Sequence, residues 1–356
     1  MHSLLEKKQN LLAEKQPPRA REAARRLGVS EAEYVALSCP GSATALDALS
    51  FSELLLELHR LGEVMVLTRN DTAVMEHYGV YANPQLRHGS VAILNNPDID
   101  LRLRLGQFKW AFAVNENSRL SLQFFDRHGS AVHKIYLTSK SDSQVFSTLL
   151  NRFKTECFMP EPEPSVRQFA SEEIRLSSEQ RRELLTDWQA IDNAHQVNGL
   201  LKKHAVTRPQ IYQLLEEGAE QLALGSVKAL MKSISERKIP VLIFVPNGVV
   251  TQIHNGRLHK LVETGPWFNV LDKRFNFHLN LQGVKQAWIV EKPTEQGVTR
   301  SVEWFDDGHN PVAMLYLHSD CRADRQMTDA WENALSALER LDGPVTENFV
   351  SHGGRR

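Results

Sequence analysis

The chain has 356 residues, of which 42% are hydrophobic and 24% charged, and its formal net charge is −1. This balance is typical of a globular protein and argues against a dedicated nucleic-acid binder, which usually carries a strong basic excess. The length suits two domains of ordinary size or one unit built by duplication.

A few residue types narrow the class further. The cysteines Cys39, Cys157 and Cys321 form no C-x-x-C pair, so a cysteine-rich zinc site and a ferredoxin-type cluster are unsupported. We expect three unpaired thiols, which suit a reducing compartment. The N-terminal stretch has no apolar core typical of a secretory signal, and no run reaches the length of a membrane span. The sequence therefore predicts a soluble, cytoplasmic protein.

Taken in chain order, the elements predicted by the apolar pattern occur twice. Residues 101–105 and 275–281 alternate apolar and polar side chains, which is typical of a half-buried antiparallel strand. Helical blocks are expected before these strands, at 4–35 and 169–234, and closing helices after them, at 142–155 and 326–341. The predicted fold class is α+β, with two similar halves that each contain a large antiparallel β-sheet flanked by helices.

Proline and glutamate alternate in "MPEPEPS", which suppresses helix and sheet and predicts a linker between the halves. The expected organisation is an N-terminal repeat at 1–158, a linker at 159–168, a C-terminal repeat at 169–345 and a disordered tail at 346–356.

Three pairs of segments support a duplication. "VMVLTRNDTAVMEHYG" (64–79) and "VLIFVPNGVVTQIHNG" (241–256) share four of 16 residues at an offset of 177. "IDLRLRLGQFKWAFAV" (99–114) and "FNFHLNLQGVKQAWIV" (275–290) share five of 16 at 176, and a pair that starts at 124 and 304 shares five of 14 at 180. Matches in the same order at nearly one offset indicate an internal repeat. Positions that differ between the halves are therefore candidates for function.

His195 is one such position, because its counterpart at an offset of 177 is Pro18. Leu184, Trp188, Ile191 and His195 follow helical spacing, so we expect one amphipathic helix with the imidazole on its apolar face. One interpretation is a core histidine bonded to a carbonyl group. The other is an axial iron ligand in an apolar pocket, since neutral imidazole binds iron and an apolar wall suits a porphyrin.

Arginines and polar residues in the predicted strands are further candidates. Arg102 lies opposite His278 in the repeat and, with Arg104, points away from the leucines of its strand. It is either part of a solvated face or a cation that donates to a ligand. Considered one at a time, four other residues are expected to be ordinary surface residues. As a group they could pair with the two propionates of haem: Arg208, Lys292, Tyr316 and Arg322.

The stretch "DNAHQVNGLLKKHAVTRPQ", the segment "DLRLRL", the duplication and the length together resemble the bacterial haemin-degrading factor family. These are cytoplasmic haem-utilisation proteins that accompany Gram-negative haem-uptake transporters. The resemblance covers about residues 20 to 340. It implies two repeats with stacked antiparallel sheets and one haem in the C-terminal half.

The resemblance also implies residue roles. His195 would be the axial ligand, Arg102 would lie on the opposite haem face and Arg208 would follow the ligand helix. Lys292, Tyr316 and Arg322 would lie near the propionates. Members of the family are haem carriers or open the haem ring, and ring opening would use Arg102 as a donor and an external source of electrons. A haem-uptake transporter or a downstream haem oxygenase would be the partner.

Two departures affect the ligand helix. Gln196, Val197 and Asn198 stand where bulky apolar residues are expected, so the helix should pack less tightly. Gly199 should loosen it by about 1 kcal/mol relative to alanine.

Two alternatives compete with haem binding. "AREAARRLGVSEAEY" (20–34) resembles a helix-turn-helix with a basic first helix, which would suit a DNA-binding regulator. A corresponding segment occurs in the other half, which favours a structural corner of the repeat. A histidine metal site is the second alternative. His77 and His254 are repeat counterparts, each followed two residues later by glycine, and this pattern favours hairpin turns over ligands.

Overall fold

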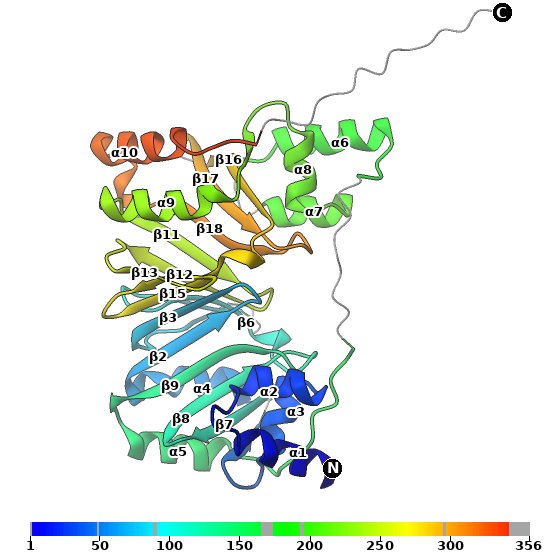
Figure 1. Ribbon diagram of the computed structural model, residues 1–356, viewed down its shortest axis with the longest axis vertical. Coiled ribbons are helices and arrows are strands. Elements are labelled where there is room, and N and C mark those ends of the chain that lie inside the picture. The colour runs from blue at the N-terminus through cyan, green and yellow to red at the C-terminus, as the bar shows by residue number, and fades with distance from the viewer. Residues whose placement is uncertain are drawn as a thin grey trace, which may run out of the picture.

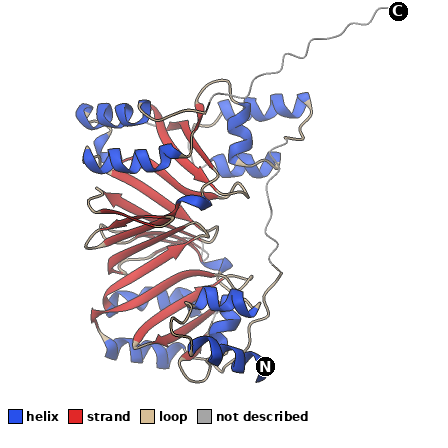
Figure 2. Cartoon of the chain, viewed as in Figure 1, coloured by secondary structure: helices blue, strands red, loops and turns tan. Residues whose placement is uncertain are grey.

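The computed structural model describes residues 2–47, 50–87, 91–164, 174–192, 196–294 and 297–341. In this part of the chain, the strands lie between helical layers at the two ends of the molecule (Figure 1, Figure 2). The predicted fold class is confirmed, because two nine-stranded antiparallel sheets are flanked by helices. None of the described helices is both long and apolar enough to span a membrane.

The first sheet has the order β1-β7-β8-β9-β2-β3-β15-β14-β13, and the second has the order β10-β16-β17-β18-β11-β12-β6-β5-β4. The strands of the first half are β1 (Ala43–Leu46), β2 (Gly62–Arg69), β3 (Ala73–Val80), β4 (Gln85–Arg87), β5 (Val91–Asn95), β6 (Asp100–Arg104), β7 (Trp110–Glu116), β8 (Arg119–Phe125) and β9 (Ala131–Ser141). Those of the second half are β10 (Ala219–Leu222), β11 (Val241–Pro246), β12 (Val250–Gly256), β13 (Leu261–Thr264), β14 (Trp267–Leu271), β15 (Phe275–Asn280), β16 (Gln286–Thr294), β17 (Gly297–Phe305) and β18 (Pro311–Leu317).

The two halves exchange strands. Each sheet takes six strands from one half and three from the other, and the junctions are the antiparallel pairs β3–β15 and β12–β6. At the second junction, Arg102 is paired with Thr251. Strand β6, which carries Arg102, therefore belongs to the sheet of the C-terminal half. An arginine encoded in the first repeat is placed beside residues of the second.

One helix of each repeat begins at an equivalent position, at an offset of 177 residues. Capping boxes start α3 and α8, formed by Ser30 with Glu33 and by Thr207 with Gln210. The helices are α1 (His2–Leu12), α2 (Ala20–Leu27), α3 (Glu31–Ala36), α4 (Phe51–Glu57), α5 (Ser143–Phe153), α6 (Ser178–Gln189), α7 (Val197–His204), α8 (Arg208–Leu214), α9 (Gly225–Glu236) and α10 (Arg325–Ser336). Short 3₁₀ turns are η2 (Leu58–Leu61), η3 (Leu105–Gln107), η5 (Leu281–Gly283) and η6 (Ser319–Cys321).

Two asparagines at an offset of 177 hold the halves together in the same way. Asn70 Nδ2 donates to Pro246 O and Val312 O at 3.0 and 2.9 Å, while Asn247 Nδ2 donates to Arg69 O and Val132 O at 3.2 and 2.8 Å. Each asparagine also accepts two backbone N–H bonds of its own turn. These reciprocal bonds confirm the repeat at the level of single residues.

The interpretation of His77 and His254 as turn residues is wrong. Both lie within strands, β3 and β12, and both are buried. His77 Nε2 is 3.3 Å from His254 Nδ1, and the rings of His254 and Phe275 stack with their centroids 3.6 Å apart. Burial lowers the pKa of His77 to about 3, so the ring is neutral at pH 7 and can pack against its counterpart.

The expectation of three unpaired thiols is also wrong. Cys39 and Cys157 form a disulfide, and Cys321 is free. The two cysteines are 118 residues apart in sequence, but the chain after α5 returns to β1, where Thr155 N donates to Ala45 O at 2.9 Å. Sequence spacing alone does not reveal such a return.

The predicted linker at 159–168 is described up to residue 164, and that part contains neither helix nor strand. The rest of the linker and the tail at 346–356 lie outside the described residues. The boundaries of the two repeats, 1–158 and 169–345, stay a prediction.

Candidate functional site

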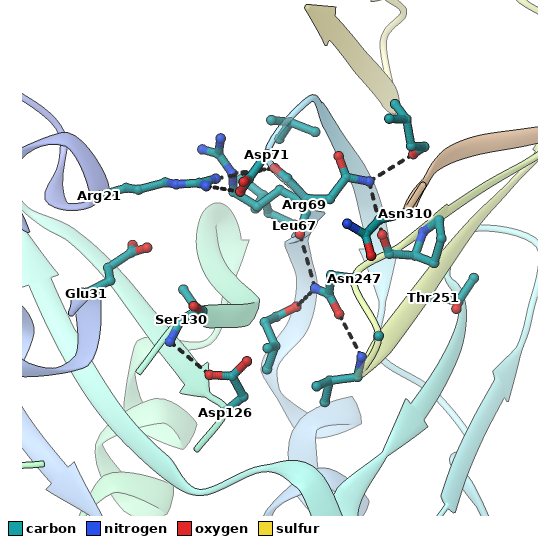
Figure 3. Close-up of a pocket in the computed structure, with 18 of the residues that line it drawn as sticks. Arg21, Glu31, Leu67, Arg69, Asp71, Asp126, Ser130, Asn247, Thr251 and Asn310 are labelled. Carbon is teal, nitrogen blue, oxygen red and sulfur yellow. Dashed lines mark hydrogen bonds and ion pairs between the residues drawn. The ribbon is translucent and has the colours of Figure 1, made fainter. Parts of the chain in front are cut away.

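An open cleft of about 2130 Å³ is lined by residues of both halves. This volume exceeds the roughly 300–1,000 Å³ of a common small-molecule pocket, so the cleft can receive a large ligand. The turns that carry Asn70 and Asn247 contribute to its walls, as does the segment from Asp126 to Ser130 (Figure 3). Arg102, Asn198 and Arg208 also line it.

Arg102 lies in the cleft as the alternation in its strand predicts. Leu101 is fully buried, whereas Arg102 and Arg104 line the cleft. Arg102 Nη1 pairs with the carboxylate of Asp100 and donates to Leu94 O and Leu101 O at 3.0 and 3.1 Å. Among the described residues, no bond of its Nη2 or Nε is found. The guanidinium is therefore anchored through one nitrogen and can donate to a ligand through the others.

The segment that carries His195 is not one helix, contrary to our expectation. Helix α6 ends at Gln189 and α7 begins at Val197. Gln196 Oε1 accepts from Asp192 N at 3.1 Å. His195 itself lies outside the described residues. Val197 is almost completely buried, so the start of α7 is packed against the core.

Asn198 and Arg208 connect this segment to the cleft. Asn198 is in the first turn of α7, and Arg208 is the first residue of α8. Arg208 Nη2 donates to Asn198 Oδ1 at 3.1 Å, and both side chains line the cleft. The residue three positions after His195 is thus fixed at the cleft wall.

Behind Arg208 is a buried polar network centred on Glu303, whose side chain is fully buried. Glu303 Oε2 accepts from Tyr212 Oη at 2.8 Å and from Arg208 Nη1 at 3.4 Å, and its other oxygen pairs with Lys292. Lys292 Nζ also lies 3.2 Å from Tyr316 Oη. Although burial opposes ionisation, the two cations hold the pKa of Glu303 at about 2.

The structure brings three of the predicted site residues together in this network and leaves one apart. Arg208, Lys292 and Tyr316 all contact the Glu303 cluster, but Lys292 is 1% exposed and does not form part of the described cleft wall. Arg322 follows η6, is exposed and does not line the cleft. The propionate roles of Lys292, Tyr316 and Arg322 stay predictions.

Glu303 and Tyr212 were not identified from the sequence. A comparison of the repeats could have identified Glu303, because its counterpart at an offset of 180 is the uncharged Gln123. Gln123 is also fully buried and donates to Ser121 Oγ at 3.1 Å. The same buried position thus carries a charge in one half and an amide in the other, which marks the C-terminal half as the specialised one.

The basic segment at 20–34 forms α2 and α3, and its counterpart in the other half forms α7 and α8. Three arginines of α2 pair with acidic side chains: Arg21 with Asp71, Arg25 with Glu22 and Arg26 with Glu14. This pairing and the repetition of the corner support the structural interpretation of the segment.

Within the described residues, Glu183, Asp187 and His204 place possible metal-ligand atoms close together. Lys203 Nζ lies 2.9 Å from Glu183 and 2.6 Å from Asp187, and His204 Nε2 lies 2.6 Å from Asp187. The lysine ammonium therefore already pairs with both carboxylates, and we assign no metal to this group.

Comparisons with known proteins agree with the geometry. The family model of the haemin-degrading HemS.ChuX domain matches residues 28–153 and 205–338, one match in each half. The hemin transport protein HemS of Yersinia enterocolitica is 32% identical over 329 residues, which are 91% of this chain and 93% of that protein.

Solved structures are similar over nearly the whole chain. Holo-PhuS, a heme-binding protein from Pseudomonas aeruginosa, has a TM-score of 0.87 at 34% identity, and the match covers 95% of this chain and 99% of that one. ChuS, described as an Escherichia coli heme oxygenase, has a TM-score of 0.81 at 28% identity. That match covers 93% of this chain and 99% of ChuS. With both halves matched by its model, the chain belongs to the haemin-degrading HemS.ChuX family.

Proposed function

We propose that this protein binds one haem on the side of the cleft formed by its C-terminal half, with His195 as the axial iron ligand. The observation that carries this proposal is the convergence of Arg102 and Arg208 on one cleft, together with Asn198, which follows His195 by three residues in the sequence. The cleft is large enough for a porphyrin, and a heme-binding protein with the same fold is among the relatives. A neutral imidazole can ligate the iron, and the two arginines can donate hydrogen bonds to a ligand on the iron or to the propionate carboxylates.

In this proposal, each residue has a separate task. The imidazole of His195 binds the metal, while Arg102, held by Asp100, offers its unused N–H groups to the opposite face. Arg208 pairs with a propionate, and Lys292, Tyr316 and Arg322 are further propionate candidates. Lys292 would have to exchange the carboxylate of Glu303 for that of the ligand, because it is paired with Glu303.

We infer that the primary role is to receive imported haem in the cytoplasm and pass it on. The hemin transport protein among the relatives supports this role. A haem-uptake transporter would supply the ligand, and a downstream haem oxygenase would receive it. The heme oxygenase among the relatives and the free N–H groups of Arg102 favour ring opening as a second activity. Haem itself supplies that redox chemistry when bound, with electrons from an external donor.

Titration of the purified chain with haemin tests the proposal. We expect saturation at one equivalent and a sharp Soret band. Reductant is then added under air in the presence of catalase. A stable ferrous complex indicates a carrier, and loss of the Soret band with the appearance of a bile-pigment band indicates ring opening. Absence of saturable binding at one equivalent would refute the proposed function.

The variant Arg102→Ala separates binding from ring opening. Because Arg102 is not the axial ligand, haemin affinity should change little. Loss of the donor on the opposite face should slow any ring opening by about tenfold or more. Arg104→Ala is the matched control, since Arg104 lies on the same strand, lines the same cleft and bonds Gly248 O at 3.2 Å. If ring opening proceeds equally fast in both variants, Arg102 has no role at the haem face.

A further inference from the structure

The N-terminal wall of the cleft contains a cluster of three arginines that haem binding does not use. Arg19 and Arg21 are at the start of α2, and Arg69 is at the end of β2. Arg21 Nη1 and Arg69 Nε both donate to Asn70 O, at 3.3 and 3.2 Å (Figure 3). Two guanidinium groups thus converge on one carbonyl group at the cleft wall.

Arg69 has few partners for a half-buried arginine. Its Nε bond to Asn70 O is the one hydrogen bond found for its side chain among the described residues, and no carboxylate there lies within ion-pair distance. Burial and the neighbouring Arg21 lower the pKa of Arg69 to about 10. A desolvated cation with four unused N–H groups is costly unless a negative charge approaches it.

The start of α2 adds further donors at the same place. The first helical bond runs from Ala23 N to Arg19 O, so the N–H groups before Ala23 have no partner within the helix. The side chain of Arg19 makes no capping bond. A helix N-terminus carries a partial positive charge and favours anions. Arg21 and Glu22, whose N–H groups are among these donors, line the cleft with Arg69.

The charges at this wall do not cancel. Asp71 pairs with Arg21, Glu22 pairs with Arg25, and Glu31 is bonded to Lys134 Nζ at 2.6 Å. Glu76 also lines the cleft, so the three arginines face two carboxylates, those of Asp71 and Glu76, and the wall keeps a net charge of about +1, which favours an anion.

The cluster exists in one half of the repeat. At an offset of 177, the counterparts of Arg19, Arg21 and Arg69 are Gln196, Asn198 and Pro246, none of which is charged. The conserved turn around Asn70 and Asn247 needs no arginine, because the C-terminal copy folds without one. The three arginines are therefore an addition specific to the N-terminal half.

We propose that Arg19, Arg21 and Arg69, together with the N-terminus of α2, form a second site in the cleft that binds the phosphate group of an anionic ligand. Arginine forks match the geometry of phosphate, and a phosphate group would bind to the excess positive charge of the wall. The site is separate from the proposed haem site, shares none of its residues and does not depend on haem binding.

Calorimetric titration of the whole chain with inorganic pyrophosphate, and separately with succinate, tests the site. We expect pyrophosphate to bind more tightly than succinate, with an affinity that falls as salt rises. Arg69→Gln should weaken pyrophosphate binding by about tenfold or more, because it removes charge-assisted bonds. Arg21→Gln should weaken it as well, and since Arg21 is partly exposed this variant tests the site even if Arg69→Gln folds poorly.

Two controls complete the test. Arg60→Gln removes a surface arginine that pairs with Glu57 away from the cleft, and it should bind pyrophosphate like the wild type. His195→Ala should also bind pyrophosphate normally, so a failure of the haem proposal would be visible separately. Undetectable pyrophosphate binding, equal binding in Arg69→Gln and Arg21→Gln, or tighter binding of succinate would each overturn the phosphate site.

Discussion

Replacement of His195 by alanine is expected to weaken haemin binding by at least about 100-fold and to shift the Soret band. Loss of a residue that merely supports a metal ligand costs about 10–100-fold in metal affinity, so loss of the ligand itself should cost at least as much. Arg208 and Arg102 would still pair with haem, so weak and spectrally altered binding should remain. Absorbance titration at the Soret maximum measures both changes.

The matched control is His259→Ala, because His259 is exposed and is no part of the described cleft wall. Its haemin affinity and spectrum should equal those of the wild type. Circular dichroism of both variants establishes that the fold is intact. An unaltered affinity and Soret band in His195→Ala would remove His195 as the ligand, and the arginines of the cleft would then need another explanation.

The sequence predicted the duplication and the class of fold, but not the exchange of strands. Alternation in 101–105 identifies a half-buried strand, and Leu101 is indeed buried while Arg102 faces the cleft. Alternation does not identify the neighbouring strand, because backbone hydrogen bonds are the same for any partner. The pairing of β6 with β12 depends on how the two halves pack, and this is a property of the whole chain.

Local spacing was also insufficient at the ligand segment. Leu184, Trp188, Ile191 and His195 fit one helical stripe, yet α6 ends at Gln189. The side chain of Gln196 accepts a hydrogen bond from the backbone N–H of Asp192, which competes with helical bonding of that backbone. Periodicity measures where apolar side chains recur, and it does not detect a side chain that competes for the backbone.

The candidate site could be predicted in part for a related reason. Arg102 stands out because its repeat counterpart is His278, and Arg208 was named from its position after His195 and from the family resemblance. The structure places both arginines at the cleft. Glu303 occupies a strand position with the same alternation as a solvent-facing residue, so its burial could not be inferred from spacing. The carboxylate of Glu303 can be buried because Lys292 neutralises its charge and Tyr212 donates a hydrogen bond to it.

The second large effect is expected for Glu303→Gln, which should lower the free energy of unfolding by about 3–5 kcal/mol at pH 7. The substitution keeps the shape of the side chain but leaves the buried ammonium of Lys292 without its counter-charge. It also weakens the bonds from Tyr212 and Arg208. Urea denaturation followed by tryptophan fluorescence measures the change.

Glu291→Gln is the matched control, because Glu291 is an exposed residue of the adjacent strand and its ion pair with Arg300 is 3.5 Å long. Loss of this surface pair should cost less than about 1 kcal/mol. If Glu303→Gln is no less stable than Glu291→Gln, the charge of Glu303 does not support the fold.

The pH dependence of the difference between Glu303→Gln and the wild type follows from the lowered pKa of Glu303. The carboxylate contributes stability above its unfolded pKa of about 4.5, and this contribution is lost as the pH falls toward about 2, where the folded protein binds the proton. The difference in unfolding free energy should therefore be constant from pH 7 to about 5 and then shrink on further acidification. The pKa of Lys292 is raised, chiefly by Glu303 against the effect of burial, so the stability from its charge should be lost only above about pH 10.5. A difference that stays the same down to pH 2 would mean that packing, and not the buried charge, makes Glu303 necessary.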